Sequence, residues 1–126
     1  MASVDYKREL KELVTIVAAE GASDLHFSVG SHPIIRVTGS LLSLEDKPIL
    51  TDQDVEGFAK ALMTSERFEL VSQRHEVDFA YGAADGARFR GNAYYQGNSL
   101  SIALRLIPQT IRSFDELGLP PILQSF

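Results

Sequence analysis

The chain has 126 residues with 44% hydrophobic and 23% charged side chains, a balance that predicts one globular domain and excludes a disordered tail. Its 12 basic and 17 acidic residues give a net charge of −5, which argues against non-specific nucleic-acid binding, so we expect no nucleic-acid partner. The lack of cysteine excludes disulfides and thiolate metal sites, and no apolar run approaches the length of a membrane-spanning helix; we expect a cytoplasmic domain.

The first half of the chain predicts one helix followed by strands. Apolar residues recur with helical spacing over 4–20, and Gly21 suits the position just after the helix. The spacing then changes to two, which predicts strands over 24–29, 34–38 and 41–44. Gly39 and Ser40 are predicted to form the two-residue loop between the second and third of these strands.

The second half predicts two helices and then a second set of strands. Thr51 is a good N-cap for a helix over 52–63, and Thr64 can cap a short helix through about residue 71. Strands are predicted over 75–82, 87–96 and 99–107, and the stretch Ser113–Glu116 has the form of a capping box that starts another short helix. Short hairpin loops dominate this order, so the expected fold class is α+β, with a mainly antiparallel sheet of about five to six strands and flanking helices.

The last two predicted strands place three arginines on one face. Gly97 and Asn98 form a favoured two-residue turn, and counting back from this turn sets Arg90 opposite Arg105. Arg88 lies two residues from Arg90 and therefore on the same face. Like charges directly opposite each other in a sheet cost up to about 1 kcal/mol. Planar guanidinium groups held side by side suit a phosphate or carboxylate from outside, which makes these arginines a candidate anion site.

A structural role is the alternative for these arginines. Glu76 and Asp78 lie on the polar face of the preceding strand, where either could neutralise Arg90 across the ladder. Exposed ion pairs of this kind contribute little to stability. Spacing alone leaves both interpretations open.

Asp24 and His26 form a second candidate pair, because residues i and i+2 of a strand point the same way. Such a pair could ligate a metal, as in a small metal hydrolase, or act as an orienting carboxylate and a base. No third ligand lies nearby, since His32 falls in a turn and His75 lies far downstream. We therefore expect a structural or interface role for Asp24 and His26, as for Asp78, and no bound metal.

The sequence has no phosphate-binding loop of the G-x-x-x-x-G-K-[ST] type, and no glycine is followed by lysine. Phosphoryl transfer needs such a cradle and its Mg²⁺ site to position and neutralise the nucleotide. We therefore expect no catalytic residues and no enzymatic activity in this chain alone.

Several stretches together resemble the twitching-motility, PilT-type ATPases, which are retraction motors of type IV pili within the secretion ATPase superfamily. The resemblance covers nearly the whole chain and rests on stretches that follow the family's order and spacing. They are GASDLHFSVG at 21–30, IRVTG at 35–39, VDFAY at 77–81, RFRGN at 88–92, LRLIP at 104–108 and FDELGLP at 114–120.

The resemblance implies a PAS-like α+β domain over 1–112, followed over 113–126 by a short helix and the start of a linker to a RecA-like motor domain that this chain lacks. The parent protein is then expected to be a homo-hexameric ATPase that uses ATP with magnesium, whereas this fragment alone is expected to hold no cofactor. The expected partner is the pilus machinery, and the expected location is cytoplasmic and peripheral to the inner membrane.

In such ATPases, arginines of the N-terminal domain reach nucleotide phosphates that are held on the motor domain. The motifs carry this role onto Arg88, Arg90 and Arg105, which would couple ATP hydrolysis to domain motion. Whether the parent is a retraction motor or a paralogue for assembly or secretion stays open.

The chain departs from the family pattern at Gly91, where relatives usually carry a β-branched residue, and at Tyr95, where many are more polar. Glycine weakens a strand interior, so Gly91 predicts a bulge or close packing. Neither departure touches the arginines.

The alternative function is a PAS-like small-molecule sensor or a protein-interaction module without an ATPase role. A sensor needs polar groups inside an apolar pocket, here between the sheet and the helices. The predicted inner face is almost wholly apolar and indicates a filled core; it consists of Leu25, Phe27, Val29, Val77, Phe79, Tyr81, Phe89, Tyr95, Leu100, Ile102 and Leu104.

Overall fold

A computed structural model describes residues 5–83 and 86–108 of the chain. In this part the elements are α1 (Tyr6–Glu20), β1 (Asp24–Ser28), β2 (Ile34–Val37), β3 (Ser40–Ser43), α2 (Asp52–Leu62), α3 (Ser65–Arg74), β4 (Glu76–Gly82), β5 (Arg88–Gln96) and β6 (Ser99–Leu106). The capping box predicted at Ser113–Glu116, and with it the whole stretch 113–126, lies outside the described residues. Within the described ranges no helix combines the length and apolar character needed to cross a membrane.

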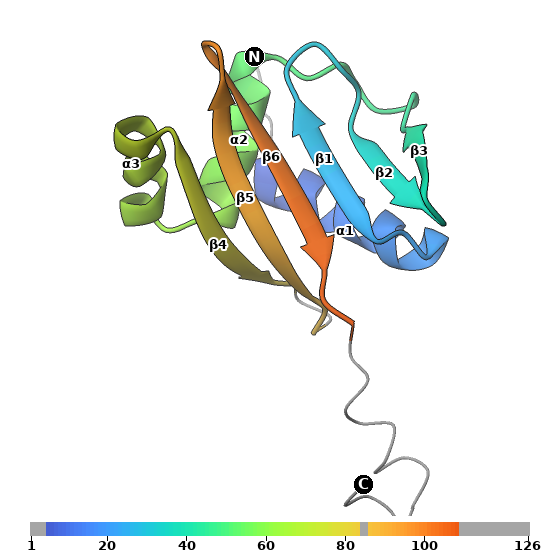
Figure 1. Ribbon diagram of the computed structural model, residues 1–126. Helices are drawn as coiled ribbons and strands as arrows, with labels where there is room; N and C mark the ends of the chain where they lie inside the picture. The colour runs from blue at the N-terminus through green and yellow to red at the C-terminus, as the bar shows by residue number, and fades with distance from the viewer. Residues whose placement is uncertain (1–4, 84–85, 109–126) are drawn as a thin grey trace, which may run out of the picture.

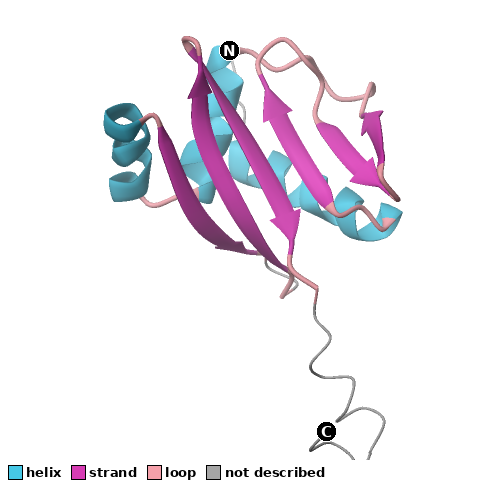
Figure 2. Cartoon of the chain, in the orientation of Figure 1, coloured by secondary structure: helices cyan, strands magenta, loops and turns pink. Residues whose placement is uncertain are grey.

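The strands form one six-stranded sheet in the order β3-β2-β1-β6-β5-β4, and every neighbouring pair is antiparallel. The central contact joins β1 to β6, which are far apart in sequence. α1 and α2 cover one face of the sheet, while α3 lies beside β4 at its edge (Figure 1). The colouring by secondary structure shows that no described helix covers the other face, which we call the open face (Figure 2). The predicted α+β class with an antiparallel sheet is confirmed.

The helix boundaries follow from the caps that the sequence supplies. Asp5 caps α1 by accepting from the backbone N–H of Arg8, and Gly21 ends the helix with a φ of 68°. Thr51 and Asp54 form a reciprocal capping box at α2. The helix predicted to end near residue 71 instead continues to Arg74, because His75 adopts the left-handed conformation that closes it. The strand predicted from residue 75 therefore begins at Glu76.

The hairpin between β2 and β3 differs from its prediction by one residue. Val37 pairs with Ser40, so the loop consists of Thr38 and Gly39 and not of Gly39 and Ser40. Thr38 has a φ of 46° and Gly39 a φ of 84°. A two-residue loop with positive φ at both positions matches the twist of the flanking strands. This match outweighs the unfavourable left-handed conformation of a β-branched threonine.

The hydrophobic core lies between the covered face of the sheet and the two long helices. The ring of Phe58 in α2 stacks on Phe27 of β1, with ring centroids 4.6 Å apart. Most of the predicted inner face is buried, namely Leu25, Phe27, Val77, Phe89, Leu100, Ile102 and Leu104, and the rest is half-buried, namely Val29, Phe79, Tyr81 and Tyr95. The core predicted as filled is thus packed with these side chains.

Of the two predictions for Gly91, a bulge or close packing, the structure shows close packing. The pairing of β5 continues through Gly91 on both sides, opposite Phe79 and Leu104, so there is no bulge at this position. A Cβ built on Gly91 would lie 2.3 Å from Cζ of Phe79. Gly91 therefore lets the Phe79 ring pack directly over the β5 backbone.

Candidate anion site on the open face

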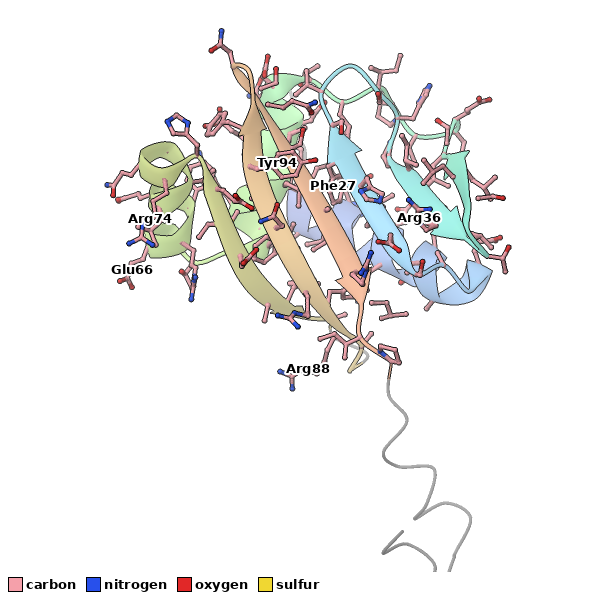
Figure 3. The ribbon with its side chains drawn as sticks, in the orientation of Figure 1. Phe27, Arg36, Glu66, Arg74, Arg88 and Tyr94 are labelled. Atoms are coloured by element: carbon pink, nitrogen blue, oxygen red, sulfur yellow. The ribbon has the colours of Figure 1, made fainter. Side chains whose placement is uncertain are left out.

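The open face of the sheet carries the polar side chains that alternate with the core residues. Exposed or half-buried positions of β5 on this face include Arg88, Arg90, Asn92 and Tyr94, and in β6 Arg105 is exposed. Of these, Figure 3 labels Tyr94, which lies in front of the sheet, and Arg88, whose side chain extends beyond the end of β5. Because successive side chains of a strand point to opposite faces of the sheet, the same strands supply both a core face and a charged face.

The sheet register aligns four charged residues in one row across the open face. Arg36 of β2 pairs with Asp24 of β1, Asp24 pairs with Arg105 of β6, and Arg105 pairs with Arg90 of β5. The charges along this row are therefore positive, negative, positive and positive, so the two cations Arg105 and Arg90 are neighbours. The predicted opposition of Arg90 and Arg105 is confirmed.

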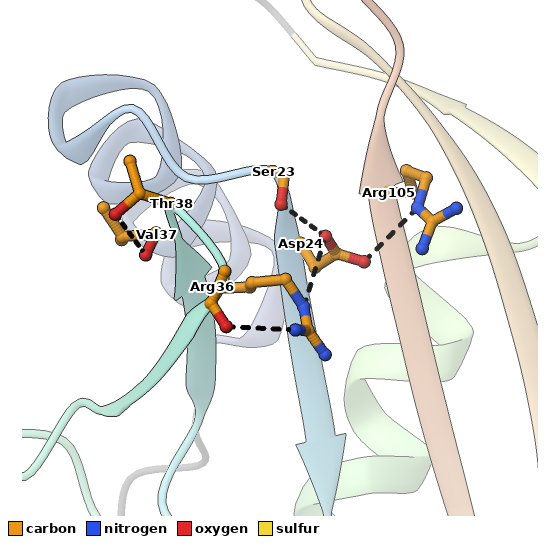
Figure 4. Close-up of polar contacts among 7 residues, drawn as sticks. Ser23, Asp24, Arg36, Val37, Thr38 and Arg105 are labelled. Atoms are coloured by element: carbon orange, nitrogen blue, oxygen red, sulfur yellow. Dashed lines mark hydrogen bonds and ion pairs between the residues drawn. The ribbon is translucent and has the colours of Figure 1, made fainter.

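Asp24 lies between Arg36 and Arg105 and contacts both (Figure 4). Its Oδ2 accepts a hydrogen bond from Nε of Arg105 at 3.4 Å. Its Oδ1 accepts from the Ser23 hydroxyl at 2.5 Å and lies 3.9 Å from Nε of Arg36. The Asp24 side chain is only 8% exposed, whereas that of Arg105 is 75% exposed. The carboxylate thus lies in the sheet and the cation that it holds reaches into solvent.

The ionisation of Asp24 and His26 follows from these neighbours. Burial acts to raise the pKa of Asp24, but the hydrogen bond from Ser23 and the charge of Arg105 outweigh it and leave that pKa below its usual value. Burial lowers the pKa of His26, and the charges of Arg36 and Arg105 add to this effect against the opposing effect of Asp24. At neutral pH the site therefore has a charged carboxylate and a neutral imidazole.

Arg90 is not neutralised in the way that the structural alternative required. It faces Ala80 across β4, while Asp78 faces Asn92. Nδ2 of Asn92 donates to Asp78 at 2.8 Å and to Glu76 at 3.0 Å, so an amide holds both carboxylates. Within the described residues Arg90 makes no ion pair and no side-chain hydrogen bond. The internal ion pair involves Arg105 instead, through Asp24.

A hollow of about 720 Å³ opens beside this row on the open face. Its floor includes Gly91 and the small side chain of Ala103, and its rim includes Arg90, Arg105, Asp24, His26, Arg67 and Asp78. Small residues in the middle of the sheet and long charged ones around them account for the depression. Arg88 is not among the residues that line it, and its side chain extends beyond the end of β5 (Figure 3). The structure thus brings together all the predicted site residues except Arg88.

The chemistry of this arrangement suits an anion. Three arginines line the hollow, of which Arg67 donates to the backbone carbonyl of Asp78, and the terminal nitrogens of Arg105 make no hydrogen bond with the described residues. Among residues 5–83 and 86–108 no three His, Asp or Glu side chains are grouped so that they could hold a metal ion. Sequence reasoning missed the link between Asp24 and Arg105, because it depends on the pairing of β1 with β6.

Comparison with curated proteins finds relatives among pilus and twitching-motility proteins. No family model matches the sequence. The chain is 31% identical over 116 residues to the type IV pilus ATPase PilU of Pseudomonas aeruginosa and, also over 116 residues, 31% identical to the type IV pilus retraction ATPase PilT of the same organism. It is 33% identical over 92 residues to a twitching motility protein of Neisseria gonorrhoeae. Each match covers 73% or more of this chain.

Solved structures with the same fold include two ATPases. The pilus retraction motor PilT with bound ADP superposes with a TM-score of 0.75 and 34% identity, over 90% of this chain and 33% of that one. The ATPase DotB of Legionella pneumophila also has a TM-score of 0.75, but its 18% identity bears on the fold alone. The chain spans 30% of the length of PilU and 33% of that of PilT from Pseudomonas aeruginosa.

Proposed function

Since the chain is homologous to PilT-type ATPases and has the fold of the PilT N-terminal domain, we propose that it is the N-terminal domain of a type IV pilus retraction ATPase. In this proposal Arg88, Arg90 and Arg105 reach the phosphates of a nucleotide that is bound on the motor domain. Neutralisation of the phosphate charge then couples ATP hydrolysis to motion between the domains.

The observation that carries the proposal is the adjacent pair of arginines on the open face. Arg90 lies opposite Arg105 in the sheet and has no ion-pair partner among the described residues. Two like charges in these positions repel each other by up to about 1 kcal/mol. A phosphate between them removes that repulsion and accepts charge-assisted hydrogen bonds from both planar groups.

Arg88 has a more distant place in the proposed site. It lies on the same face of β5 as Arg90, at the end of the strand and outside the hollow. From there it suits a second phosphate oxygen or a charge on the approaching domain.

The nucleotide must be supplied by another domain, because this sequence has no phosphate-binding loop. The solved PilT motor holds ADP, and we assign ATP with magnesium to the motor domain of the parent protein. A homo-hexameric parent that works with the pilus machinery on the cytoplasmic side of the inner membrane belongs to the same proposal.

The packing of the core is less suited to a small-molecule sensor. Six of the side chains that would line a pocket between sheet and helices, from Leu25 and Phe27 to Ile102 and Leu104, are at most 3% exposed and pack in one core. The hollow beside the arginines lies on the opposite face of the sheet.

The test is ATP hydrolysis by the full-length protein that carries this domain. Loss of a charge-assisted hydrogen bond costs about 1.5–3 kcal/mol, so Arg90→Ala or Arg105→Ala should lower kcat/KM by roughly 10- to 100-fold. Arg8→Ala is the matched control, because Arg8 is an exposed arginine of α1 on the covered side. Its activity should equal that of the wild type.

Thermal melting of each variant separates loss of function from loss of folding. Full ATPase activity in well-folded Arg90→Ala and Arg105→Ala variants would contradict the proposed role of both arginines.

A further inference from the structure

Asp24 is the one charged residue that is buried in the described part of the chain. A buried carboxylate is unfavourable unless hydrogen bonds and opposite charges compensate for its lost hydration. Here Ser23, Arg36 and Arg105 provide that compensation.

The two arginines that flank Asp24 are held in different ways. Arg36 directs Nε toward Oδ1 of Asp24 and also donates from Nη1 to the carbonyl of Gly39 at 3.3 Å. The side chain of Arg105 has a single polar contact within residues 5–83 and 86–108, from Nε to Oδ2 of Asp24. Figure 4 shows that this contact runs from Nε and that neither terminal nitrogen of Arg105 is joined to the carboxylate. Arg36 is therefore fixed at two points, whereas the fork of Arg105 is held at its base and left open at its tip.

This single-point contact depends on how the two oxygens of Asp24 are divided. Ser23 and Arg36 occupy the side of Oδ1, so only Oδ2 remains for Arg105. A carboxylate with both oxygens free would bind a guanidinium by two parallel hydrogen bonds and would use up a terminal nitrogen. The observed contact uses Nε alone and leaves both terminal nitrogens of Arg105 without a bond to Asp24.

Arg90 adds a second reason for a fixed negative charge beside Arg105. The two arginines are direct partners in the β5–β6 ladder, and a free Arg105 would move away from Arg90 to reduce their repulsion. Asp24 is the partner of Arg105 on its other side, in β1. The carboxylate attracts Arg105 at Nε and offsets part of the repulsion.

We propose that Asp24 is a positioning residue that holds Arg105 by Nε and presents its terminal nitrogens, next to Arg90, to an incoming phosphate. This inference rests on the proposed function, because it concerns the same anion. Asp24 itself does not touch the phosphate; it acts through Arg105 by restricting the side chain before the anion arrives.

A competing role for Asp24 gives the opposite result in a binding experiment. If the carboxylate were only an internal counter-ion, it would compete with phosphate for Arg105, and its removal would tighten anion binding. If it positions Arg105, its removal frees a long side chain whose ordering is unfavourable, and binding weakens.

The experiment uses the 126-residue chain with inorganic pyrophosphate as the probe, titrated by NMR at one low ionic strength. The variants are Asp24→Asn, which keeps the shape and removes the charge, Arg105→Ala and the double variant. Asp52→Asn is the matched control, because Asp52 is exposed at the start of α2 on the covered side. We expect about a tenfold loss of affinity for Arg105→Ala, about a fivefold loss for Asp24→Asn, no further loss in the double variant, and wild-type affinity for the control.

A second readout needs no ligand. The Nε–H signal of Arg105 should be resolved and slow to exchange in the wild type, and it should lose this protection in Asp24→Asn. If Asp24→Asn does not fold, Ser23→Ala is used in its place, since it removes the hydrogen bond that orients Oδ1 and should weaken pyrophosphate binding about twofold.

The outcomes separate the two proposals. Pyrophosphate affinity that is unchanged or tighter in Asp24→Asn, together with a loss in Arg105→Ala, overturns the positioning role and leaves the arginine site intact. Equal affinity in Arg105→Ala and the wild type counts against the proposed function, and the inference then fails with it.

Discussion

Gly91 shows how one absent side chain shapes both faces of the sheet. Its missing Cβ leaves room for the Phe79 ring on the covered face, directly opposite in β4. On the open face its backbone is part of the floor of the hollow beside Arg90. A residue that weakens an isolated strand thus permits the packing that holds this strand in place.

Gly91→Ala should destabilise the fold. The new Cβ would lie 2.3 Å from Cζ of Phe79, so the ring must move out of its packed position. Overpacking of this kind costs about 1–3 kcal/mol, measured as the free energy of unfolding in urea. Gly82→Ala is the control, because a Cβ on Gly82 meets no atom within 4 Å, and its effect should stay within about 0.5 kcal/mol. Wild-type stability of Gly91→Ala would show that Phe79 is not packed as described.

His26 should make the stability of the domain depend on pH. Its pKa is lowered from 6.5 by burial and by Arg36 and Arg105, against the opposing effect of Asp24. The unfolded chain therefore binds this proton at a higher pH than the folded domain does, and stability falls as the pH drops below 6.5. Asp24 contributes a separate loss only at lower pH, because its pKa is below 3.8.

His26→Gln is the variant that tests this dependence. Urea unfolding between pH 7 and about pH 5 should show a smaller loss of stability in His26→Gln than in the wild type. Identical slopes in the two proteins would mean that His26 titrates alike in the folded and unfolded states.

At the scale of the elements, Tyr6 joins the two helices that cover the sheet. Its hydroxyl donates to Oδ1 of Asp54 at 2.7 Å, and Oδ2 of the same carboxylate accepts from the backbone of Thr51 in the capping box of α2. The Tyr6 ring lies over Gly57, where a Cβ would meet it at 2.3 Å. The first turn of α1 is thereby tied to the first turns of α2.

Tyr6→Phe should lower the free energy of unfolding by about 1–2 kcal/mol, because it removes a hydrogen bond to a charged acceptor. Burial and the contact with Asp54 raise the pKa of Tyr6 to about 12, from 10.0. Its contribution is therefore complete below pH 10 and is lost as the pH rises toward 12, a loss that Tyr6→Phe should not show.

Tyr94→Phe is the control for this prediction. The hydroxyl of Tyr94 makes no hydrogen bond with the described residues, and its ring is half-buried on the open face. Equal stability of Tyr6→Phe and Tyr94→Phe would contradict a role for the Tyr6 hydroxyl in joining the helices.

Local and non-local features of the fold differ in how well the sequence predicts them. The pairing of Arg90 with Arg105 depends on a two-residue turn, and counting from that turn gives the observed register. The contact between Asp24 and Arg105 joins residues 81 positions apart, and no local pattern indicates that β1 lies beside β6. The sequence therefore predicts the cations of the candidate site and singles out Asp24, but it does not predict the contact between Asp24 and Arg105.

The same limit applies to backbone conformation and close packing. Thr38 with its positive φ shifts the β2–β3 loop by one residue, because the twist of the paired strands outweighs the local preference of threonine. The contact of Tyr6 with Gly57 likewise appears only once α1 and α2 are placed together. Elements and caps are thus predictable here, whereas contacts between distant elements require the three-dimensional arrangement.

At the scale of the whole molecule, the 126-residue chain should bind phosphate weakly and hydrolyse no ATP. Arg90 and Arg105 can neutralise phosphate charge, but the sequence has no phosphate-binding loop, and without one a Mg²⁺–nucleotide complex is not positioned for attack by water. Phosphate release from ATP with Mg²⁺ should equal that of the Arg90→Ala/Arg105→Ala double variant, whereas a full-length protein with the proposed motor domain should turn over ATP. If the 126-residue chain released more phosphate from ATP than the double variant, catalysis would take place in this domain. The proposal that the arginines and the catalytic residues lie on separate domains would then be wrong.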